Sequence, residues 1–339
     1  MANLIPVPDD FEACVAHPLA AESAIEAYIG EAARKGLKRV ALVGCGGSHF
    51  GAYPAYDFLD RHLSQISVNH ITSAELTSRA PAWLDSSCLV VAASHSGNTP
   101  ETLAAAEFAR DRGCPTIGIS RVGSNGLSRT CDIHLDYPDT ITITEPKLMH
   151  TMLISLALAR LEGHAELAGA IRSSLDVMPH ALRIGKDEIA EVGDAIGAMA
   201  AETDYAAYIG AGPGFGQAKM MAWCYSMEML WMQAAAINGG DFFHGPLELT
   251  LPGAPLVVLA AEDPTRPIAQ RAIDFASRHT ERLHVIDSAA LSMPGVSEAA
   301  RGELSVLSMI SASRRVLDHI AVHRRHDTSV RRYMYKVAY

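Results

Sequence analysis

One apolar run that turns directly into hydroxyl residues constrains this sequence most: CLVVAASHSGNTPET, Cys88–Thr102. Its apolar part, Leu89–Ala93, has the length and side-chain branching of a buried parallel strand. Pro100 and Glu101 then begin an alanine-rich helix that we expect to extend to Arg110, because proline suits a first turn and a carboxylate suits the positive end of the helix dipole. A loop at such a junction directs free N–H groups and hydroxyls to one point, as an anion site does.

The loop carries more hydroxyl groups than a helix start needs. A plain helix cap uses one Ser or Thr side chain, whereas this loop offers several within a few residues: Ser94, Ser96 and Thr99. The alternative of an ordinary capped helix is therefore less favoured than a site for the oxygens of a phosphate monoester. We predict a phosphate-binding loop here.

A second, glycine-rich loop lies upstream. The short apolar strand Val40–Val43 is followed by GCGGS, Gly44–Ser48, whose glycines allow a sharp turn and a close approach to a ligand. The continuation HFG departs from the G-x-G-x-x-G fingerprint of dinucleotide sites. Alone this loop is a weak signal, but the two loops together are a much stronger one.

The pairing of GCGGS with SHSGNTPET resembles the SIS family, the sugar isomerase fold of phosphosugar-binding proteins. The likeness extends from about Ala41 to Tyr339. It implies that the loop hydroxyls hold the phosphate of a sugar phosphate: Ser48, Ser94, Ser96 and Thr99. Weaker candidates for substrate contact are their loop neighbours and one lysine near the end of the chain: Gly46, Gly47, His95, Gly97, Asn98 and Lys336.

Composition excludes several other classes. A formal net charge of −10 argues against a nucleic-acid partner, for which a basic surface is typical. No apolar run has transmembrane length, and the N-terminus lacks the basic and apolar regions of a signal peptide, so we expect no membrane association. Six cysteines without a CxxC pair indicate reduced thiols in a cytoplasmic protein.

The chain also repeats itself weakly. VALVGCGGSHFGAYPA from Val40 is echoed by YAAYIGAGPGFGQAKM from Tyr205, and the segment from Cys88 is echoed by PLVVLAAEDPTRPIAQRAIDFA from Pro255. Strands alternating with helices indicate parallel sheets wrapped by helices. We therefore expect an α/β protein of two tandem SIS domains, each a flavodoxin-like three-layer sandwich. The second copy replaces the hydroxyls by two carboxylates within Ala261–Thr265, so we expect an anion only in the first.

The boundary should lie in the helical stretch between the copies. Three helices are expected there: Leu153–Glu162, Ala165–Val177 and Glu188–Ala201, with breaks at Gly163, Pro179 and Gly185-Lys186. We assign residues 1–180 to a phosphate-binding domain and residues 181–339 to a domain that carries the chemistry and the C-terminal tail.

A long Met-, Ala- and Trp-rich helix is expected at Gln217–Ala235, with Glu228 in its middle. Because the helix is apolar nearly all round, we expect it to be buried. Burial raises a carboxyl pKa toward the value that a general base needs. The alternative, a buried Glu satisfied by backbone groups or by a distant Lys or Arg, is equally compatible with the pattern.

A shaped loop, NGGDFFHGPLE, follows and contains His244, a side chain suited to proton transfer near neutral pH. His-Gly-Pro-x-Glu sixteen positions after the helical Glu228 resembles the isomerase domain of glucosamine-6-phosphate synthase. It resembles still more the deglycases that cleave Amadori products of sugar phosphates. The resemblance implies that Glu228 is the proton-transferring base, and that His244 opens the sugar ring or acts as general acid. It also implies that His244 reaches the partner's site in a homodimer.

The C-terminus resembles the deglycases further, because RRYMYKVAY matches their RRYM-x-KVxY ending. The synthase carries a glutaminase domain, which we do not expect in the roughly forty residues before the first strand. One departure concerns Glu145–Met152, where a lysine is missing from its usual place in these families. Lys147 or His150 is then expected to contact the substrate differently.

No metal or organic cofactor is expected. His319, His323 and His326 include an i, i+4 pair, but without the Glu of H-E-x-x-H they indicate a solvated helix end.

The predicted reaction converts a fructosamine 6-phosphate to glucose 6-phosphate and a free amine. Two alternatives stay open: an aldose–ketose isomerase or aminosugar-phosphate deaminase that uses the same residues, and a phosphosugar sensor without enzymatic activity.

Overall fold

The computed structural model describes residues 4–138 and 141–338, which form two compact units. The N-terminal unit comprises Pro8–His180 with Gly295–Ala300. The C-terminal unit comprises Ala181–Pro294, the residues from Arg301 onward and a short segment that ends at Val7. Helix α10 (Met178–Glu188) contains the point at which the chain passes from one unit to the other.

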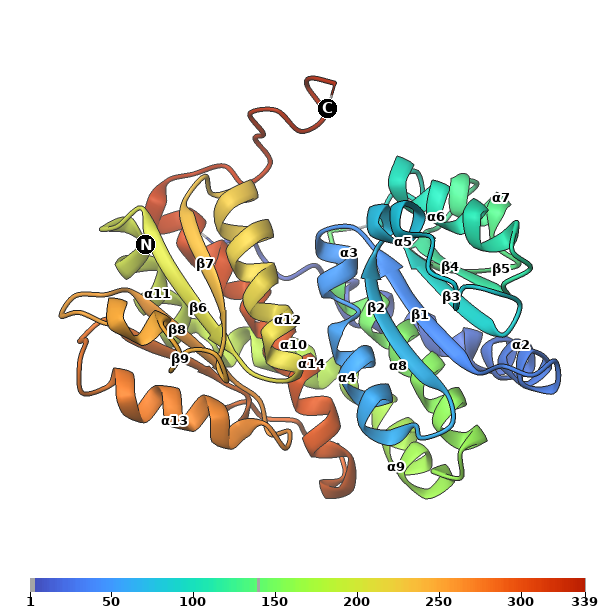
Figure 1. Cartoon of the computed structure of the whole chain (residues 1–339). Coiled ribbons are helices and arrows are strands. Elements are labelled where there is room, and N and C mark those ends of the chain that lie inside the picture. Colours follow the sequence, from blue (N-terminus) through green and yellow to red (C-terminus); the bar gives the residue numbers. More distant parts are fainter. Residues whose placement is uncertain (1–3, 139–140, 339) are drawn as a thin grey trace. The chain divides into compact units, whose positions relative to one another are not determined.

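The N-terminal unit is built on a five-stranded parallel sheet with the order β2-β1-β3-β4-β5 (Figure 1). Its strands are β1 (Arg39–Gly44), β2 (Ser67–Thr72), β3 (Cys88–Ala93), β4 (Thr116–Arg121) and β5 (Ile133–Tyr137). Every residue of β3 is buried, as expected of a central strand covered on both faces. The apolar strands predicted at Val40–Val43 and Leu89–Ala93 are thus confirmed.

Helices cover both faces of this sheet. One face packs against α5 (Ser73–Arg79), α6 (Pro100–Arg110) and α7 (Gly126–Thr130). The other packs against a layer centred on α8: α2 (Glu22–Arg34), α4 (Tyr53–His62) and α8 (Thr144–Leu161), with α1 (Phe11–Ala16), η1 (His17–Ala21) and α9 (Ala165–Leu175) alongside. Ala105 and Ala109 of α6 are fully buried against the sheet, because small side chains let a helix approach closely.

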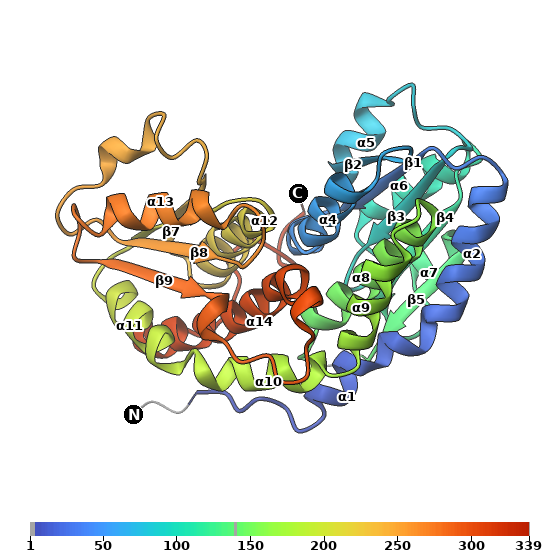
Figure 2. The same ribbon diagram turned by 90° about the horizontal axis from the view of Figure 1, so that it is seen from below.

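The C-terminal unit repeats the pattern with a four-stranded parallel sheet, β7-β6-β8-β9. Its strands are β6 (Tyr205–Gly210), β7 (Gln233–Asn238), β8 (Leu256–Ala260) and β9 (Leu283–Asp287). One face is covered by α13 (Arg266–Ala276), as Figure 2 shows. The other is covered by α11 (Ala190–Ala201), α12 (Pro213–Lys219) and α14 (Glu298–Arg324).

The internal repeat predicted from the sequence is confirmed by the backbone. Gly46 follows β1 with φ 49° and ψ −125°, and Gly212 follows β6 with φ 47° and ψ −131°. Both positions turn the chain into a helix through a conformation that residues with a side chain rarely adopt. The predicted fold, parallel sheets flanked by helices, is therefore confirmed in both units.

Two expectations about helices are wrong. The helix predicted at Gln217–Ala235 is divided: α12 ends at Lys219, the π-helix η2 (Met220–Met229) follows, and Gln233–Ala235 begin β7. The short alanine run of β7 has no periodicity that separates strand from helix. The breaks predicted at Pro179 and Gly185-Lys186 lie inside α10. Proline is tolerated in the first turn of a helix. At Gly185 the missing side chain serves close packing and not a break, because a Cβ there would lie 3.3 Å from Ser308 Oγ.

No helix within residues 4–138 and 141–338 is long and apolar enough to cross a membrane.

Candidate active site

The two predicted phosphate loops lie side by side at one edge of the N-terminal sheet. Strands β1 and β3 pair in parallel with Gly44 opposite Ala93, so both loops leave the sheet at the same level. The chain continues from β1 to the neighbour β2 on one side and from β3 to β4 on the other. Sheets of this order bind ligands at such a switch point, outside the carboxyl ends of the strands.

The hydroxyls of the second loop converge. Ser94 Oγ lies 2.8 Å from Thr99 Oγ1 and 3.5 Å from Ser96 Oγ. Ser94 is only 3% exposed, and Thr99 precedes the first residue of α6 with its side chain bonded to Ser94 and to no helix N–H. Several hydroxyls at a helix N-terminus form a suitable environment for a phosphate.

The first loop contributes Ser48 and brings a cation near it. Lys147 Nζ, on α8, donates to Ser48 Oγ at 3.5 Å. The two loops are also connected, because Thr102 Oγ1 lies 3.7 Å from Cys45 Sγ. Gly44 cannot be replaced easily, since a Cβ there would meet backbone atoms of His49 and Ala93 at 3.0 and 3.2 Å.

The weaker loop candidates hold the loop itself. Asn98 Oδ1 accepts from Gly126 N at 2.8 Å, and its Nδ2 donates to Ser96 O at 3.2 Å. His95 Nδ1 lies 3.1 Å from the buried Tyr137 hydroxyl. These side chains therefore position the loop backbone.

His150 does not share the environment of Lys147. It is 1% exposed and lies in the core, where its Nε2 is 2.7 Å from Asp136 O. Burial lowers the pKa of His150 to about 4. Of the two residues expected to contact substrate differently, only Lys147 lies beside a predicted phosphate ligand.

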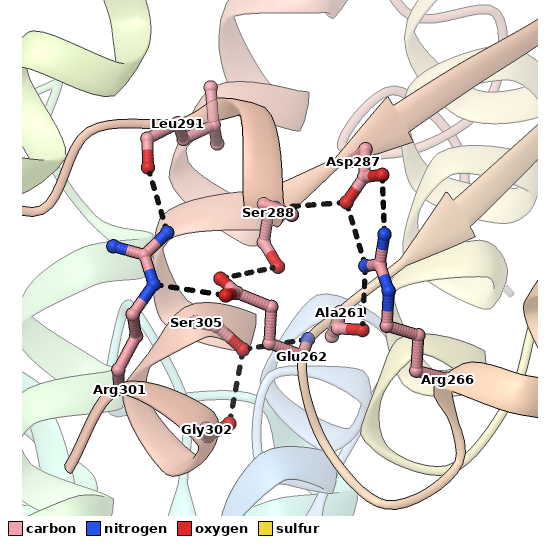
Figure 3. Close-up of polar contacts among 10 residues, drawn as sticks. Ala261, Glu262, Arg266, Asp287, Ser288, Leu291, Arg301, Gly302 and Ser305 are labelled. Atoms are coloured by element: carbon pink, nitrogen blue, oxygen red, sulfur yellow. Dashed lines mark hydrogen bonds and ion pairs between the residues drawn. The ribbon is translucent and has the colours of Figure 1, made fainter. Parts of the chain in front are cut away.

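The counterpart loop of the C-terminal unit is filled by ion pairs, as Figure 3 shows. Glu262 Oε1 accepts from Arg301 Nε at 2.9 Å, and Arg266 forms a two-point ion pair with Asp287. Burial opposes ionisation of Asp287, but hydrogen bonds from Arg266 more than compensate and lower its pKa. The expectation that carboxylates take the place of the hydroxyls in this loop is confirmed, and one of them, Glu262, is paired with Arg301.

Glu228 lies near the end of the π-helix and lines a pocket of about 520 Å³. The pocket walls come from the starts of β6 and β7, from the end of the π-helix and from the tail: Tyr205, Met227, Trp231, Met232, Gln233, Ala234, Arg331, Arg332, Tyr333 and Met334. The Glu228 side chain is 26% exposed and is paired with Arg331. The expectation of a fully buried helix is wrong, since Trp223 is 49% exposed.

His244 lies at the other end of β7. The turn that follows Asn238 contains it, with His244 N donating to Asp241 O at 2.9 Å, and the side chain is exposed. The Glu228 pocket, in contrast, is lined by Gln233, the first residue of β7. The six residues of β7 place its first residue, beside the Glu228 pocket, roughly 17 Å from its last residue, beside the His244 turn. The two predicted catalytic residues of one chain are therefore not brought together within the C-terminal unit.

The three C-terminal histidines do not form a solvated end. His319 is 5% exposed and packs against Gly193, and His323 Nε2 lies 2.8 Å from Asp194 Oδ1. The described part of the chain contains no group of three or more His, Cys, Asp or Glu side chains arranged to hold a metal ion.

Arg331 is the residue of this region that sequence reasoning missed. A distant Lys or Arg is one alternative that the pattern allows for Glu228, but no local signal links Glu228 with Arg331 of the RRYM segment, 103 positions later. Lys336 is exposed in the same tail, and Tyr339 lies outside the described residues.

Comparisons with known proteins agree with this architecture. A model of the SIS domain matches residues 36–162. The chain is 31% identical to fructosamine deglycase FrlB of Bacillus subtilis, covering 93% of this chain and 97% of the relative. It is 27% identical to fructoselysine 6-phosphate deglycase of Escherichia coli O157:H7, and the match covers 91% of this chain and 89% of that relative. A crystal structure of a candidate phosphosugar isomerase from Salmonella typhimurium superposes with a TM-score of 0.87 at 31% sequence identity. The superposition covers 94% of this chain and 99% of that chain.

Proposed function

We propose that this chain, which belongs to the SIS family of sugar-phosphate enzymes, is a deglycase that cleaves a fructosamine 6-phosphate to glucose 6-phosphate and a free amine. The observation that carries the proposal is the 31% identity to a fructosamine deglycase over 97% of that relative. The converging hydroxyls at a sheet switch point and the carboxylate in a pocket supply the two kinds of group that this reaction needs.

The phosphate group of the substrate is assigned to the loops after β1 and β3. Ser94, Ser96 and Thr99 offer hydroxyls and the N-terminus of α6 offers free N–H groups. Ser48 adds a hydroxyl, and the Lys147 ammonium adds positive charge next to it. Phosphate binding by these groups needs no metal.

Proton transfer is assigned to Glu228 and ring opening to His244. Glu228 removes a proton from C1 of the open-chain ketosamine while the C2 carbonyl oxygen takes up a proton, which gives an enaminol. Glu228 then returns its proton to C2 as the nitrogen loses its own proton. The product is an aldimine, in which nitrogen is doubly bonded to C1. Water then adds to C1 and the amine leaves, so that glucose 6-phosphate and the amine are released. A positioned acid–base group of this kind contributes roughly 10²–10⁴ in rate.

The finer assignments belong to the same proposal. We infer a cytoplasmic homodimer in which His244 serves the partner's site, and no nucleic-acid partner. The described cysteines are all free thiols, as is usual in a reducing compartment. The opposite positions of Glu228 and His244 along β7 support a shared site, because one chain's pair is too far apart to act on adjacent atoms of one sugar.

A panel of 6-phosphorylated fructosamines tests the proposal, with glucose 6-phosphate release as the measurement. The wild-type protein should release it, and Glu228→Gln should abolish turnover while still binding the substrate. Glu191→Gln, an exposed position on α11, is the matched control and should remain active. Interconversion of fructose 6-phosphate and glucose 6-phosphate, or ammonia release from glucosamine 6-phosphate, without deglycation would instead identify an isomerase or a deaminase.

A further inference from the structure

We propose that Arg331 is a positioning residue that fixes one oxygen of the Glu228 carboxylate and leaves the other to transfer the proton. The inference rests on the role proposed above for Glu228. It assigns a function to the tail that follows α14, which the reaction scheme does not otherwise use.

The contact between the two side chains is one-sided. Arg331 Nε donates to Glu228 Oε1 at 3.0 Å, and Arg331 Nη2 lies 2.9 Å from the same oxygen. Within residues 4–138 and 141–338, Glu228 Oε2 makes no hydrogen bond or ion pair. Since Glu228 lines the pocket, Oε2 is the carboxylate oxygen left for a ligand there.

The guanidinium is itself held in place. Its remaining nitrogen, Nη1, donates to Thr328 O at 2.6 Å and to Val330 O at 3.1 Å. The turn that supplies these carbonyls is closed by Asp327, whose Oδ1 accepts from Ser329 N at 2.8 Å. All three guanidinium nitrogens are therefore engaged, so Arg331 presents a fixed fork to Glu228 rather than a mobile charge.

The segment before this turn is also anchored. Arg324, the last residue of α14, donates to Thr203 O at 2.9 Å and pairs with Asp204 Oδ1 at 2.7 Å. Thr203 and Asp204 immediately precede β6, and Tyr205 at the start of β6 lines the Glu228 pocket. The tail is thus tied to the sheet edge at which Glu228 acts.

The consequence is a selective effect on the chemical step. A carboxylate near the end of a helix has several rotamers, and a misplacement of about 1 Å costs about 10²-fold in rate. Because four of the five N–H groups of Arg331 are already engaged with Glu228 and with the turn, its loss should lower kcat far more than it raises KM. A lysine offers one point charge in place of the two nitrogens, so it should restore activity only in part.

The test compares Arg331→Ala, Arg331→Lys and Arg325→Gln with a 6-phosphorylated fructosamine as substrate. Arg325 lies exposed in the same segment, and its side chain has no hydrogen bond or ion pair among the described residues, which makes Arg325→Gln the control. We expect kcat to fall about 100-fold in Arg331→Ala with less than a threefold change in KM, and to recover at least tenfold when guanidinium is added. Arg331→Lys should lie between Arg331→Ala and the wild type.

A double variant separates positioning from other roles. Because Glu228→Gln should bind the substrate without turnover, the two are compared by binding: if Arg331 acts only through Glu228, Glu228→Gln with Arg331→Ala should bind the 6-phosphorylated fructosamine as tightly as Glu228→Gln alone. Equal kcat in Arg331→Ala and Arg325→Gln, a loss confined to KM, or a loss that guanidinium does not restore would overturn the inference. An active Glu228→Gln variant would overturn the proposed function as well, whereas an inactive Glu228→Gln with a normal Arg331→Ala would overturn only the role of Arg331.

Discussion

Glu228 precedes the first residue of β7, and His244 follows its last. Gln233 lines the Glu228 pocket, while the turn that contains His244 begins at Asn238. The six residues of β7 keep the two side chains at opposite ends of this strand. This separation supports the proposal that the Glu228 and His244 that serve one substrate come from different copies of the chain.

Mixing two inactive variants should therefore restore activity. We expect Glu228→Gln and His244→Ala chains, exchanged in equal amounts, to recover up to about a quarter of wild-type turnover, because half of the dimers are hybrids with one intact site of two. The rate of glucose 6-phosphate release is measured after subunit exchange. If hybrid dimers form and remain inactive, each site belongs to a single chain.

Removal of the Ser94 hydroxyl should weaken binding of the phosphate. Ser94 is buried at the centre of the hydroxyl cluster, bonded to Thr99, and a hydrogen bond to a charged group contributes about 1.5–3 kcal/mol. We expect Ser94→Ala to raise the dissociation constant of a sugar 6-phosphate at least about tenfold by calorimetry. Ser86→Ala, at an exposed turn, should not change it.

Gly97→Ala should distort the same loop. Gly97 has φ +68°, and a Cβ there would overlap the Asn125 side chain. Gly113 has a similar φ of +75° but only a Ser86 Cβ at 3.6 Å, so Gly113→Ala is the matched control for backbone strain. We expect Gly97→Ala to lose more thermal stability than Gly113→Ala and also to bind sugar phosphate poorly. Equal effects of the two substitutions would show that the Asn125 contact is unimportant.

Stability should fall in mild acid because of His150. Burial lowers the pKa of His150 to about 4, below the ordinary value of 6.5. The folded state therefore binds a proton less readily than the unfolded state. The contribution of neutral His150 to the free energy of unfolding is fully present above pH 6.5 and is lost as the pH falls toward 4. The total loss is about 3 kcal/mol at most. Urea unfolding at pH 7 and pH 5 measures it.

The His150→Gln variant provides the comparison for this pH dependence. It should unfold with a flatter pH dependence than the wild type between pH 7 and pH 5. His180→Gln, at an exposed position of the same unit, should keep the wild-type slope. A wild-type slope in His150→Gln would assign the acid sensitivity to another group.

The position of the two loops after β1 and β3 could be predicted because their signals are local. An apolar run such as Cys88–Ala93 forms a buried strand wherever helices cover both faces, and a serine- and glycine-rich loop before Pro100 can only begin the next helix. The repeat of this pattern from Tyr205 extended the prediction to the second sheet. The helix at Gln217–Ala235 could not be divided correctly, because the alanines of β7 suit strand and helix alike.

The sequence by itself determined the α/β fold, the hydroxyl loops and the candidate residues Glu228 and His244. The tertiary structure alone decided how the candidates lie. It showed that Arg331, 103 positions away, holds one oxygen of Glu228, and that Lys147 approaches Ser48 across 99 positions. The physical reason is that local patterning sets strands, turns and caps, whereas partners distant in sequence meet only when the sheet order and the end of α14 bring them to one place.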